Sequence, residues 1–405
     1  MKTAAIICEY NPLHKGHIYH MRYTKELTGC DAIVCLMSGN FMQRGIPSIM
    51  NKWNRAEIAV LSGADLVIEL PAVFSVSSAE FFAQGAVKLL QDLSIIDFLS
   101  FGSESGDINL IKTSAKIIGS EPIEYRELLK KHLDEGLPFA KARSKSLIEY
   151  LTLKDININT KESIESFIES PNNILALEYC KALDKINSII KPVTITRHGD
   201  GYNHKELSSN FASATAIREA LRIKSPDLIK EHLPDYTYNK LKEIQESNYE
   251  FTFEEDMFPY LKYKLLLNND LNKLPDVSEG LDNKIYSSII NSNSLKELIL
   301  NSKSKRYTYT RLNRILCQYF IGFDNYQLDS LRRTPSSYAR ILAFNDKGRI
   351  LIKRMKKSSQ LELINKIPSN INRMLELDIQ CTKAYSLINK AIEPNDDYIK
   401  SPIYL

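Results

Sequence analysis

The first twenty residues constrain the fold more than any other stretch of the chain. Residues 3–8 are small, aliphatic or β-branched, a composition typical of a strand that is buried on both faces. Asn11 and Pro12 end that strand, and apolar residues return with helical spacing after Lys15. A helix that starts beyond a buried strand points its unpaired N–H groups and its positive dipole end at whatever lies there. This stretch therefore predicts a phosphate site.

His14 and His17 frame the predicted phosphate site. They are three residues apart across Gly16, so both imidazoles can face one ligand. We expect them to hold the α- and β-phosphates of a nucleotide while charge moves onto a leaving pyrophosphate. Taken alone, the two residues are equally compatible with a pair of surface histidines on a turn.

The first loop resembles the leading motif of the H-x-G-H nucleotidyltransferase superfamily, Gly-x-Phe-Asp-Pro-x-His-x-Gly-His. The His14-Lys15-Gly16-His17 core is intact, whereas Cys8, Tyr10 and Asn11 replace the usual Gly, Phe and Asp. The resemblance implies a Rossmann-like domain that transfers adenylyl groups, with His14, His17 and Lys15 as its catalytic residues. It also implies ATP contacts at Ile7, Cys8, Glu9, Tyr10, Asn11, Pro12, Leu13, His14, Lys15, Gly16, His17 and His20.

Strands alternate with helices through the first half of the chain. Further buried strands are predicted at residues 31–37, 64–70, 96–101 and 192–197, with a mainly helical insertion at about 107–190. This order predicts right-handed crossovers and a parallel sheet, hence an α/β domain over residues 1–222. The resemblance implies that this is the nucleotidyltransferase domain. Ligands of such sheets bind beyond the carboxyl ends of the strands, where Gln43 and Arg44 follow the second strand. A solvated loop arginine is the plainer interpretation of Arg44.

Other polar residues and glycines also follow predicted strands or begin predicted helices. Gly102 would let a ligand approach the backbone, or would simply serve a turn. Asn172 and Asn173 either cap a helix or bring an amide to the nucleotide. Arg197 and His198 end the fifth strand, where a guanidinium can bind a phosphate with two hydrogen bonds.

A second phosphate-binding pattern occurs near residue 215. Ser213 can cap a helix whose first turn carries Thr215 and Arg218, which would offer N–H groups, hydroxyls and a cation to one phosphate. The pattern resembles the superfamily's second motif, Ser-x-[Ser/Thr]-x-x-Arg. The alternative is an ordinary capped helix.

Length and composition limit the class of protein. The chain has 405 residues, which favours two or three domains. No apolar run reaches the length of a membrane span, and the N-terminus lacks a secretion pattern, so we expect a cytoplasmic protein without membrane partners. The six cysteines are scattered without metal-ligand spacing, and no protein-bound metal is expected.

Positive charge is concentrated between residues 303 and 357, in a segment that we call the basic window. It contains fourteen lysines and arginines and three acids, a net charge of +11 in a chain whose total is +4. Residues 223–405 read as mostly helical, so we expect a basic, helical, RNA-binding domain rather than a merely solvated face. The candidate RNA contacts are Lys303, Lys305, Arg306, Tyr307, Arg311 and Arg314.

The whole chain is similar to the bacterial tRNA(Met) cytidine acetate ligases. The resemblance is carried by residues 7–20, 37–45, 101–104, 278–283 and 307–312. It implies acetylation of the N4 amine of the wobble cytidine of elongator tRNA(Met), with acetate, ATP and Mg2+. Two alternatives remain open: a nucleotidyltransferase acting on a small phosphorylated metabolite, and a noncatalytic, nucleotide-sensing RNA-binding protein.

Overall fold

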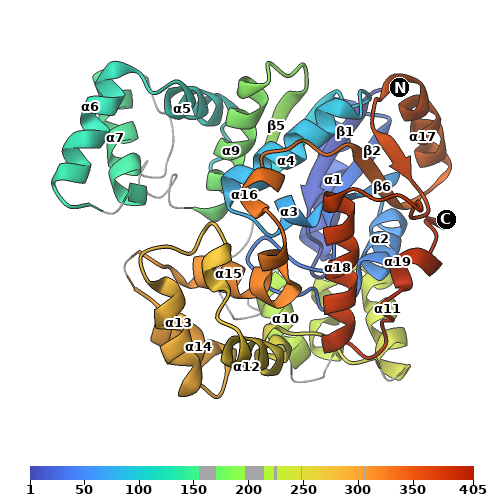
Figure 1. Ribbon diagram of the computed structural model, residues 1–405. Helices are drawn as coiled ribbons and strands as arrows, with labels where there is room; N and C mark the ends of the chain where they lie inside the picture. Colours follow the sequence, from blue (N-terminus) through green and yellow to red (C-terminus); the bar gives the residue numbers. More distant parts are fainter. Residues whose placement is uncertain (138, 155–169, 197–213, 223–225, 248, 305) are drawn as a thin grey trace.

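A single sheet organises the molecule. The computed structural model describes residues 1–405 except 138, 155–169, 197–213, 223–225, 248 and 305. Within these residues the strand order is β5-β4-β1-β2-β3-β6-β7, and β8 pairs with β6 (Figure 1). The first five strands are parallel, so their carboxyl ends meet along one edge of the sheet. They are β1 (Thr3–Cys8), β2 (Ala32–Ser38), β3 (Leu66–Leu70), β4 (Phe98–Ser103) and β5 (Lys191–Thr196).

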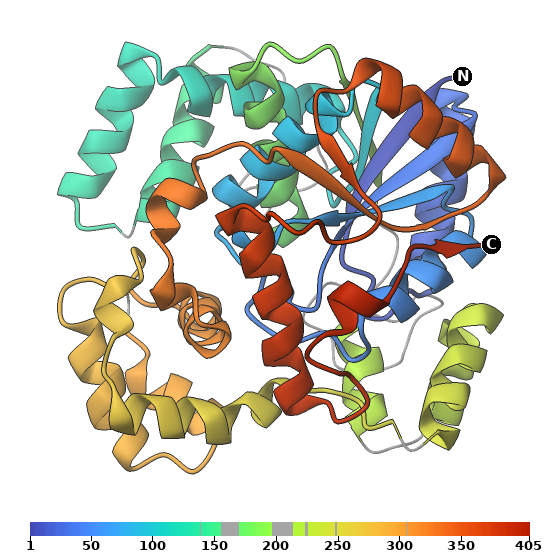
Figure 2. The ribbon, with the colours of Figure 1, turned by 45° about the vertical axis from the view of Figure 1, so that its right-hand side comes forward.

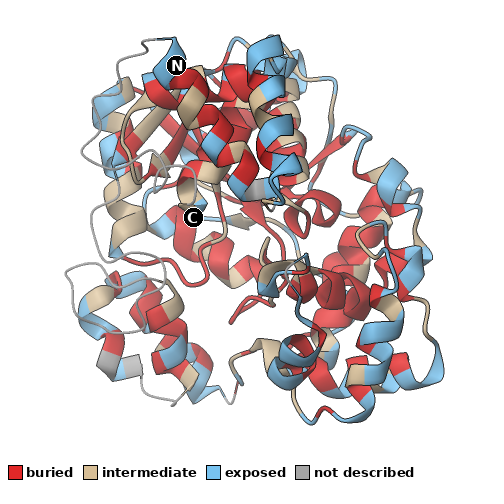
Figure 3. Cartoon of the chain, turned by 90° about the vertical axis from the view of Figure 1, so that its left-hand side faces the viewer, coloured by how far each residue is buried: buried red, intermediate tan, exposed pale blue. Residues whose placement is uncertain are grey.

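The central strands are apolar because helices cover both faces of the sheet. All seven residues of β2 are buried, as a parallel strand inside an α/β layer requires. Figure 3 shows this burial concentrated in the sheet and on the inner sides of the helices. The helices that connect β1 to β4 are α1 (Lys15–Thr28), α2 (Lys52–Leu61), α3 (Ala72–Ser75) and α4 (Ala79–Asp92).

Between β4 and β5, outside residues 138 and 155–169, the structure describes four helices. They are α5 (Ile108–Ser120), α6 (Ile123–Asp134), α7 (Phe139–Leu153) and α9 (Pro171–Lys185). Helices α6 and α7 extend away from the sheet (Figure 1), whereas α9 packs against α4, α5 and β4. Helix α9 therefore brings its first turn back to the carboxyl edge of the sheet.

Helices dominate the chain after β5. They are α10 (Ala214–Arg222), α11 (Asp235–Glu246), α12 (Phe258–Leu267), α13 (Leu281–Ile290), α14 (Leu295–Ser302), α15 (Tyr309–Ile321) and α16 (Leu328–Leu331). Short 3-10 helices occur at η1 (Pro226–His232), η2 (Glu254–Met257), η3 (Leu271–Lys273) and η4 (Phe323–Asn325). The most deeply buried helix of this group is α15, in which nine consecutive or near-consecutive residues from Leu312 to Ile321 are buried.

The C-terminal segment returns to the sheet, and the sequence analysis predicted none of the strands that it contributes. Strand β6 (Tyr338–Phe344) runs antiparallel to β3, and β7 (Glu362–Ile364) and β8 (Ile403–Tyr404) pair with β6. Figure 2 shows this orange strand beside the blue strands of the sheet. The remaining helices are α17 (Asp346–Ser358), α18 (Arg373–Ile388) and α19 (Asp396–Ile399).

Arg340 explains why β6 was missed. An arginine in the middle of a short apolar run argues against a buried strand, because a lone charge is costly to bury. In the fold, Arg340 lies 2.7 Å from Asp397 Oδ1 and 3.5 Å from Glu69 Oε2, and Lys52 lies 2.9 Å from each of the same two carboxylates. Partners that are distant in sequence thus compensate the buried charge.

The expected α/β class with a mostly parallel sheet and a mostly helical second half is confirmed. Where the two domains divide remains a prediction, because strands from beyond residue 222 complete the sheet. No helix among the described residues is both long and apolar enough to cross a membrane.

Candidate active site

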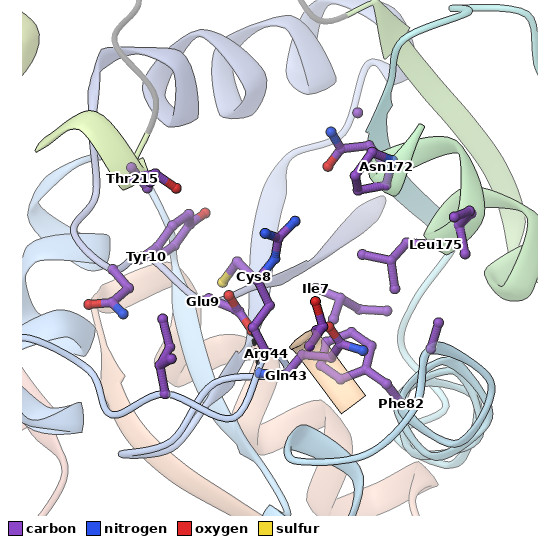
Figure 4. A pocket seen from close by; sticks show the side chains of 18 of the residues that line it. Ile7, Cys8, Glu9, Tyr10, Gln43, Arg44, Phe82, Asn172, Leu175 and Thr215 are labelled. Atoms are coloured by element: carbon purple, nitrogen blue, oxygen red, sulfur yellow. Dashed lines mark hydrogen bonds between the residues drawn. The ribbon is translucent and has the colours of Figure 1, made fainter. Parts of the chain in front are cut away.

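A cavity of about 650 Å3 opens at the carboxyl edge of the sheet. It is lined from β1, from the first turns of α1, α9, α10 and α15, and from the loop between β2 and α2. Its volume suits a nucleotide-sized ligand. Figure 4 shows Thr215 and Tyr10 toward one end and Leu175 and Phe82 toward the other, with Cys8, Glu9 and Arg44 between them.

His14 and His17 form one corner of this cavity. Their rings stack with centroids 3.7 Å apart, and both line the cavity. His14 Nδ1 accepts the N–H of Gly16 at 3.1 Å, and His17 Nδ1 accepts the N–H of His14 at 3.1 Å. In the neutral imidazoles the proton therefore sits on Nε2 in each ring. Two N–H donors at the start of α1 can then stabilise negative charge on a phosphate.

The end of β1 is locked to the loop that follows β2. Buried Arg55 donates to the carbonyl of Glu9 at 2.6 Å and also to the carbonyls of Ser38 and Gly39. Asn11 accepts the N–H of Ile49 at 2.9 Å. Because these bonds fix both strand ends, the backbone around the histidines is preorganised.

Glu9 is the carboxylate at this edge of the cavity. Its Oε1 accepts the backbone N–H of Gln43 at 2.7 Å. Burial raises the pKa of Glu9 above its ordinary value, and the Gln43 N–H and the Arg44 guanidinium oppose that rise. Glu9 therefore ties the β2–α2 loop, with Arg44, to the end of β1.

Hydrogen bonds join the start of α9 to the end of β4, and we call this contact the β4–α9 clamp. Asn172 donates to Glu104 Oε1 at 2.6 Å, and the backbone N–H of Asn173 donates to Glu104 Oε2 at 3.0 Å. Asn173 Oδ1 accepts the N–H of Glu104 at 3.0 Å in return. Asn172 and Gly102 line the cavity, whereas Asn173 is fully buried beneath it. Neither asparagine is the N-cap of α9, because Ser170 occupies that position and Pro171 begins the helix.

Helix α10 forms one end of the cavity, and the apolar side chains of Phe82 and Leu175 lie at the other end. Thr215 and Arg218 both line it. Arg218 donates to Glu254 Oε2 at 2.7 Å, and Arg222 pairs with the other oxygen of the same carboxylate. Glu254 thus holds two arginines at the point where the second motif was expected to bind phosphate.

Some predicted site residues lie elsewhere. Lys15 is exposed at the first position of α1 and is not among the cavity-lining residues. Pro12 and Leu13 lie in the loop before α1 and Gly16 lies in the first turn of α1, and none of the three lines the cavity. Arg197, His198, Ser213 and Lys305 lie outside the described residues.

The candidate tRNA contacts do not form one group. Lys303 and Arg306 are exposed, and Arg306 pairs with Glu279. Tyr307 is only 7% exposed and its ring is covered by the Arg311 guanidinium, so it offers little surface for a base to stack on. Arg314 lines the cavity instead, and burial lowers its pKa from the ordinary arginine value.

Several cavity residues were not anticipated from the sequence. They are Phe82, Leu175, Tyr179, Glu254, Tyr309 and Asn313. The apolar members have the spacing of ordinary core positions on α4 and α9, so nothing local distinguishes them. The others come from segments more than 200 residues away from the histidines in sequence.

No group of three or more His, Cys, Asp or Glu side chains is placed to hold a metal ion in the part of the chain that the structure describes.

The chain is similar to known proteins over its full length. The family model described as HIGH Nucleotidyl Transferase matches residues 1–398. Two curated relatives named tRNA(Met) cytidine acetate ligase, from Clostridium novyi (strain NT) and Clostridium tetani (strain Massachusetts / E88), are 54% and 49% identical, each across 100% of both chains.

Solved structures give the same result. The chain is similar to Thermotoga maritima TmcAL bound with alpha-thio ATP, with a TM-score of 0.89, 31% identity and coverage of 100% of both chains. The apo form of that protein gives a TM-score of 0.90. The chain therefore belongs to the HIGH nucleotidyl transferase family and, within it, to the tRNA(Met) cytidine acetate ligases.

Proposed function

We propose that this protein activates acetate with ATP and transfers the acetyl group to the N4 amine of the wobble cytidine of elongator tRNA(Met), in the cytoplasm. The observation that carries the proposal is the stacked pair His14 and His17 at the start of α1, facing a cavity that Thr215 and Arg218 close at one end. The names of the full-length relatives support the same reaction.

In the first step an acetate oxygen attacks the α-phosphorus of ATP. The bond from that phosphorus to the bridging oxygen breaks, pyrophosphate leaves, and acetyl-adenylate forms. The Nε2 donors of His14 and His17 stabilise the charge that develops on the phosphates. Thr215 and Arg218 bind the tail, so ATP competes with Glu254 for Arg218. Lys15, Arg197 and Ser213 are further predicted contacts to the tail.

Further contacts to ATP are proposed at Gly102, Asn172 and His198. Gly102 and Asn172 lie together at the β4–α9 clamp, where the nucleoside end of ATP would sit against exposed backbone and an amide. His198, at the predicted end of the fifth strand, is a further expected contact. Mg2+ would neutralise negative charge on the phosphates of ATP.

In the second step the cytidine amine attacks the acetyl carbonyl. The carbon–oxygen bond to AMP breaks, and the amine loses one proton. No covalent enzyme intermediate is required. Lys303, Lys305, Arg306 and Arg311 are proposed to steer the tRNA toward the cavity through its phosphates.

The test is an incubation of purified protein with labelled acetate, ATP, Mg2+ and total tRNA, followed by nucleoside analysis of the RNA. We expect N4-acetylcytidine only when ATP is present, with AMP and pyrophosphate released. Absence of label in RNA, with pyrophosphate released only when a phosphorylated metabolite is added, would support a small-molecule nucleotidyltransferase. ATP binding without pyrophosphate release would support a noncatalytic sensor.

A further inference from the structure

The end of the cavity opposite α10 is apolar. Ile7 from β1, Phe82 from α4 and Leu175 from α9 line it, and Figure 4 shows them near one another on the side away from Thr215. Phe82 is 3% exposed and its ring lies 6.5 Å from that of Tyr179, which is 5% exposed. These buried rings leave the apolar wall little room to move.

Arg44 stands between that apolar end and the phosphate-binding residues. It lines the cavity, and its guanidinium is close enough to Glu9 to oppose the rise in the pKa of that carboxyl. The neighbouring Gln43 is oriented differently, because its amide donates to the carbonyl of Ser77 at 3.1 Å. Arg44 is therefore the cation of the β2–α2 loop that lines this part of the cavity.

The loop that carries Arg44 is held from two further directions. Asn313 on α15 donates to the carbonyl of Arg44 at 3.0 Å. Gly45 has a φ of +75°, and a Cβ there would come within 2.4 Å of the backbone nitrogen of Arg314. Together with the bond from Gln43 to Glu9, these contacts fix the backbone of Arg44 before any ligand binds. Such preorganisation reduces the entropy lost on binding.

The direction from which the acid attacks the α-phosphorus of ATP indicates that the acid binds at the apolar end of the cavity. In phosphoryl transfer the attacking and leaving oxygens are roughly in line through phosphorus. If Thr215 and Arg218 hold the pyrophosphate side of ATP, the acid must approach from the opposite side, where Arg44 and the apolar wall lie. A short carboxylic acid needs a cation for its carboxylate and an apolar surface for its chain.

We propose that Arg44 binds the carboxylate of the acid substrate and that Ile7, Phe82 and Leu175 form a wall that limits the acid to one methyl group. This assignment rests on the proposed acetate activation. It makes Phe82 and Leu175 specificity-determining residues, and it makes Arg44 a substrate-binding residue that belongs to the ATP-dependent half-reaction rather than to tRNA binding.

The experiment compares acetate, propionate and butyrate in acid-dependent exchange of labelled pyrophosphate into ATP. Phe82→Ala and Leu175→Ala should raise the propionate-to-acetate ratio of kcat/KM by about 10- to 200-fold, the range for one methylene group in an apolar pocket. Leu89→Ala, on the same helix but outside the lining, is the matched control and should leave the ratio unchanged. The milder Phe82→Leu covers the case in which Phe82→Ala does not fold.

The carboxylate contact is tested separately. Arg44→Gln should raise the KM for acetate at least about tenfold while the Kd for ATP stays within about twofold, because a charge-assisted contact is lost from the acid alone. Arg349→Gln removes an exposed cation on α17, outside the cavity, and is the matched control.

The outcomes separate the two proposals. If the wild-type protein shows no acetate-dependent exchange, the proposed function fails. If the wild type exchanges but folded Phe82 and Leu175 variants keep its acid preference, or Arg44→Gln keeps its KM for acetate, the acid site is wrong.

Discussion

The residues of the histidine loop (7–20) lie close together in the fold, whereas those of the basic window (303–357) do not. Residues 7–20 remain together in the fold, because a strand, a turn and a helix start allow one local geometry, and most of their side chains reach one cavity. The cations of residues 303–357 are instead distributed over α15, β6 and α17. A motif defined by backbone geometry therefore localises a site, whereas a net charge along a sequence does not define a surface.

Acidic partners neutralise much of the basic window. Arg306, Arg332, Arg333, Arg340 and Arg349 each pair with a carboxylate. Helix α17 also lies at the other edge of the sheet from the cavity, because Lys347 donates to the carbonyl of Asp31 and Arg354 to that of Met1. Both acceptors precede the amino ends of β1 and β2.

The largest effect is expected inside the basic window itself. Arg340→Met should lower the free energy of unfolding by about 3–5 kcal/mol, because it leaves the buried carboxylates of Glu69 and Asp397 short of a cation. Arg349→Met, which breaks an exposed pair with Asp346, should cost about 1 kcal/mol or less. Urea titration measures both, and equal losses would remove the distinction between buried and surface cations.

The histidine loop should respond in catalysis more than in stability. His14→Ala should slow acetate-dependent pyrophosphate exchange about 10²- to 10³-fold, because one donor to the phosphates is lost. It also removes the acceptor for the Gly16 N–H, which costs about 1 kcal/mol of stability. His14→Asn restores an acceptor but not the Nε2 donor, so it should recover stability without recovering exchange. tRNA binding should be intact in both, and normal exchange would show that His14 has no role in catalysis.

A pH effect is expected where the C-terminal segment joins the sheet. Burial, assisted by the charge of Glu69, raises the pKa of Asp378 from 3.8 to about 7. Between these values the folded protein keeps a proton that the unfolded chain has released. This contribution to stability is therefore full below pH 3.8 and is lost as the pH rises through 7.

Asp378→Asn should remove that dependence. Its free energy of unfolding, relative to the wild type, should rise as the pH increases from about 4 to about 8. The exposed Asp346→Asn variant serves as the control. If the free energies of unfolding of the wild type and of Asp378→Asn changed in parallel with pH, that result would contradict the raised pKa of Asp378.

The smallest expected effect is a change in the affinity for tRNA. Arg306→Glu should weaken tRNA binding several-fold and flatten its salt dependence by about one to two released counterions, while pyrophosphate exchange is unchanged. Lys356→Glu, on exposed α17, makes the same charge change at the other edge of the sheet and should leave tRNA binding unchanged. Equal losses in the two variants would mean that RNA contacts both parts of the basic window.

The sequence alone determined the α/β class, the strand–turn–helix around the histidines and the two places where phosphates are expected. These features depend on periodicity, turn residues and helix starts, which act over a few neighbouring positions. Helix boundaries and the parallel strands β1 to β5 follow from the same local physics.

Only the tertiary structure decided where distant charges and apolar side chains meet. In the fold, β6 pairs with β3, and Arg314 lines the cavity. Asn173 is hydrogen-bonded to Glu104 beneath the cavity. Ile7, Phe82 and Leu175 lie together at one end of the cavity. Burial of a charge is stabilising only when a partner reaches it, and an apolar position looks the same whether it faces a core or a ligand. Both depend on contacts between residues that are far apart in the chain.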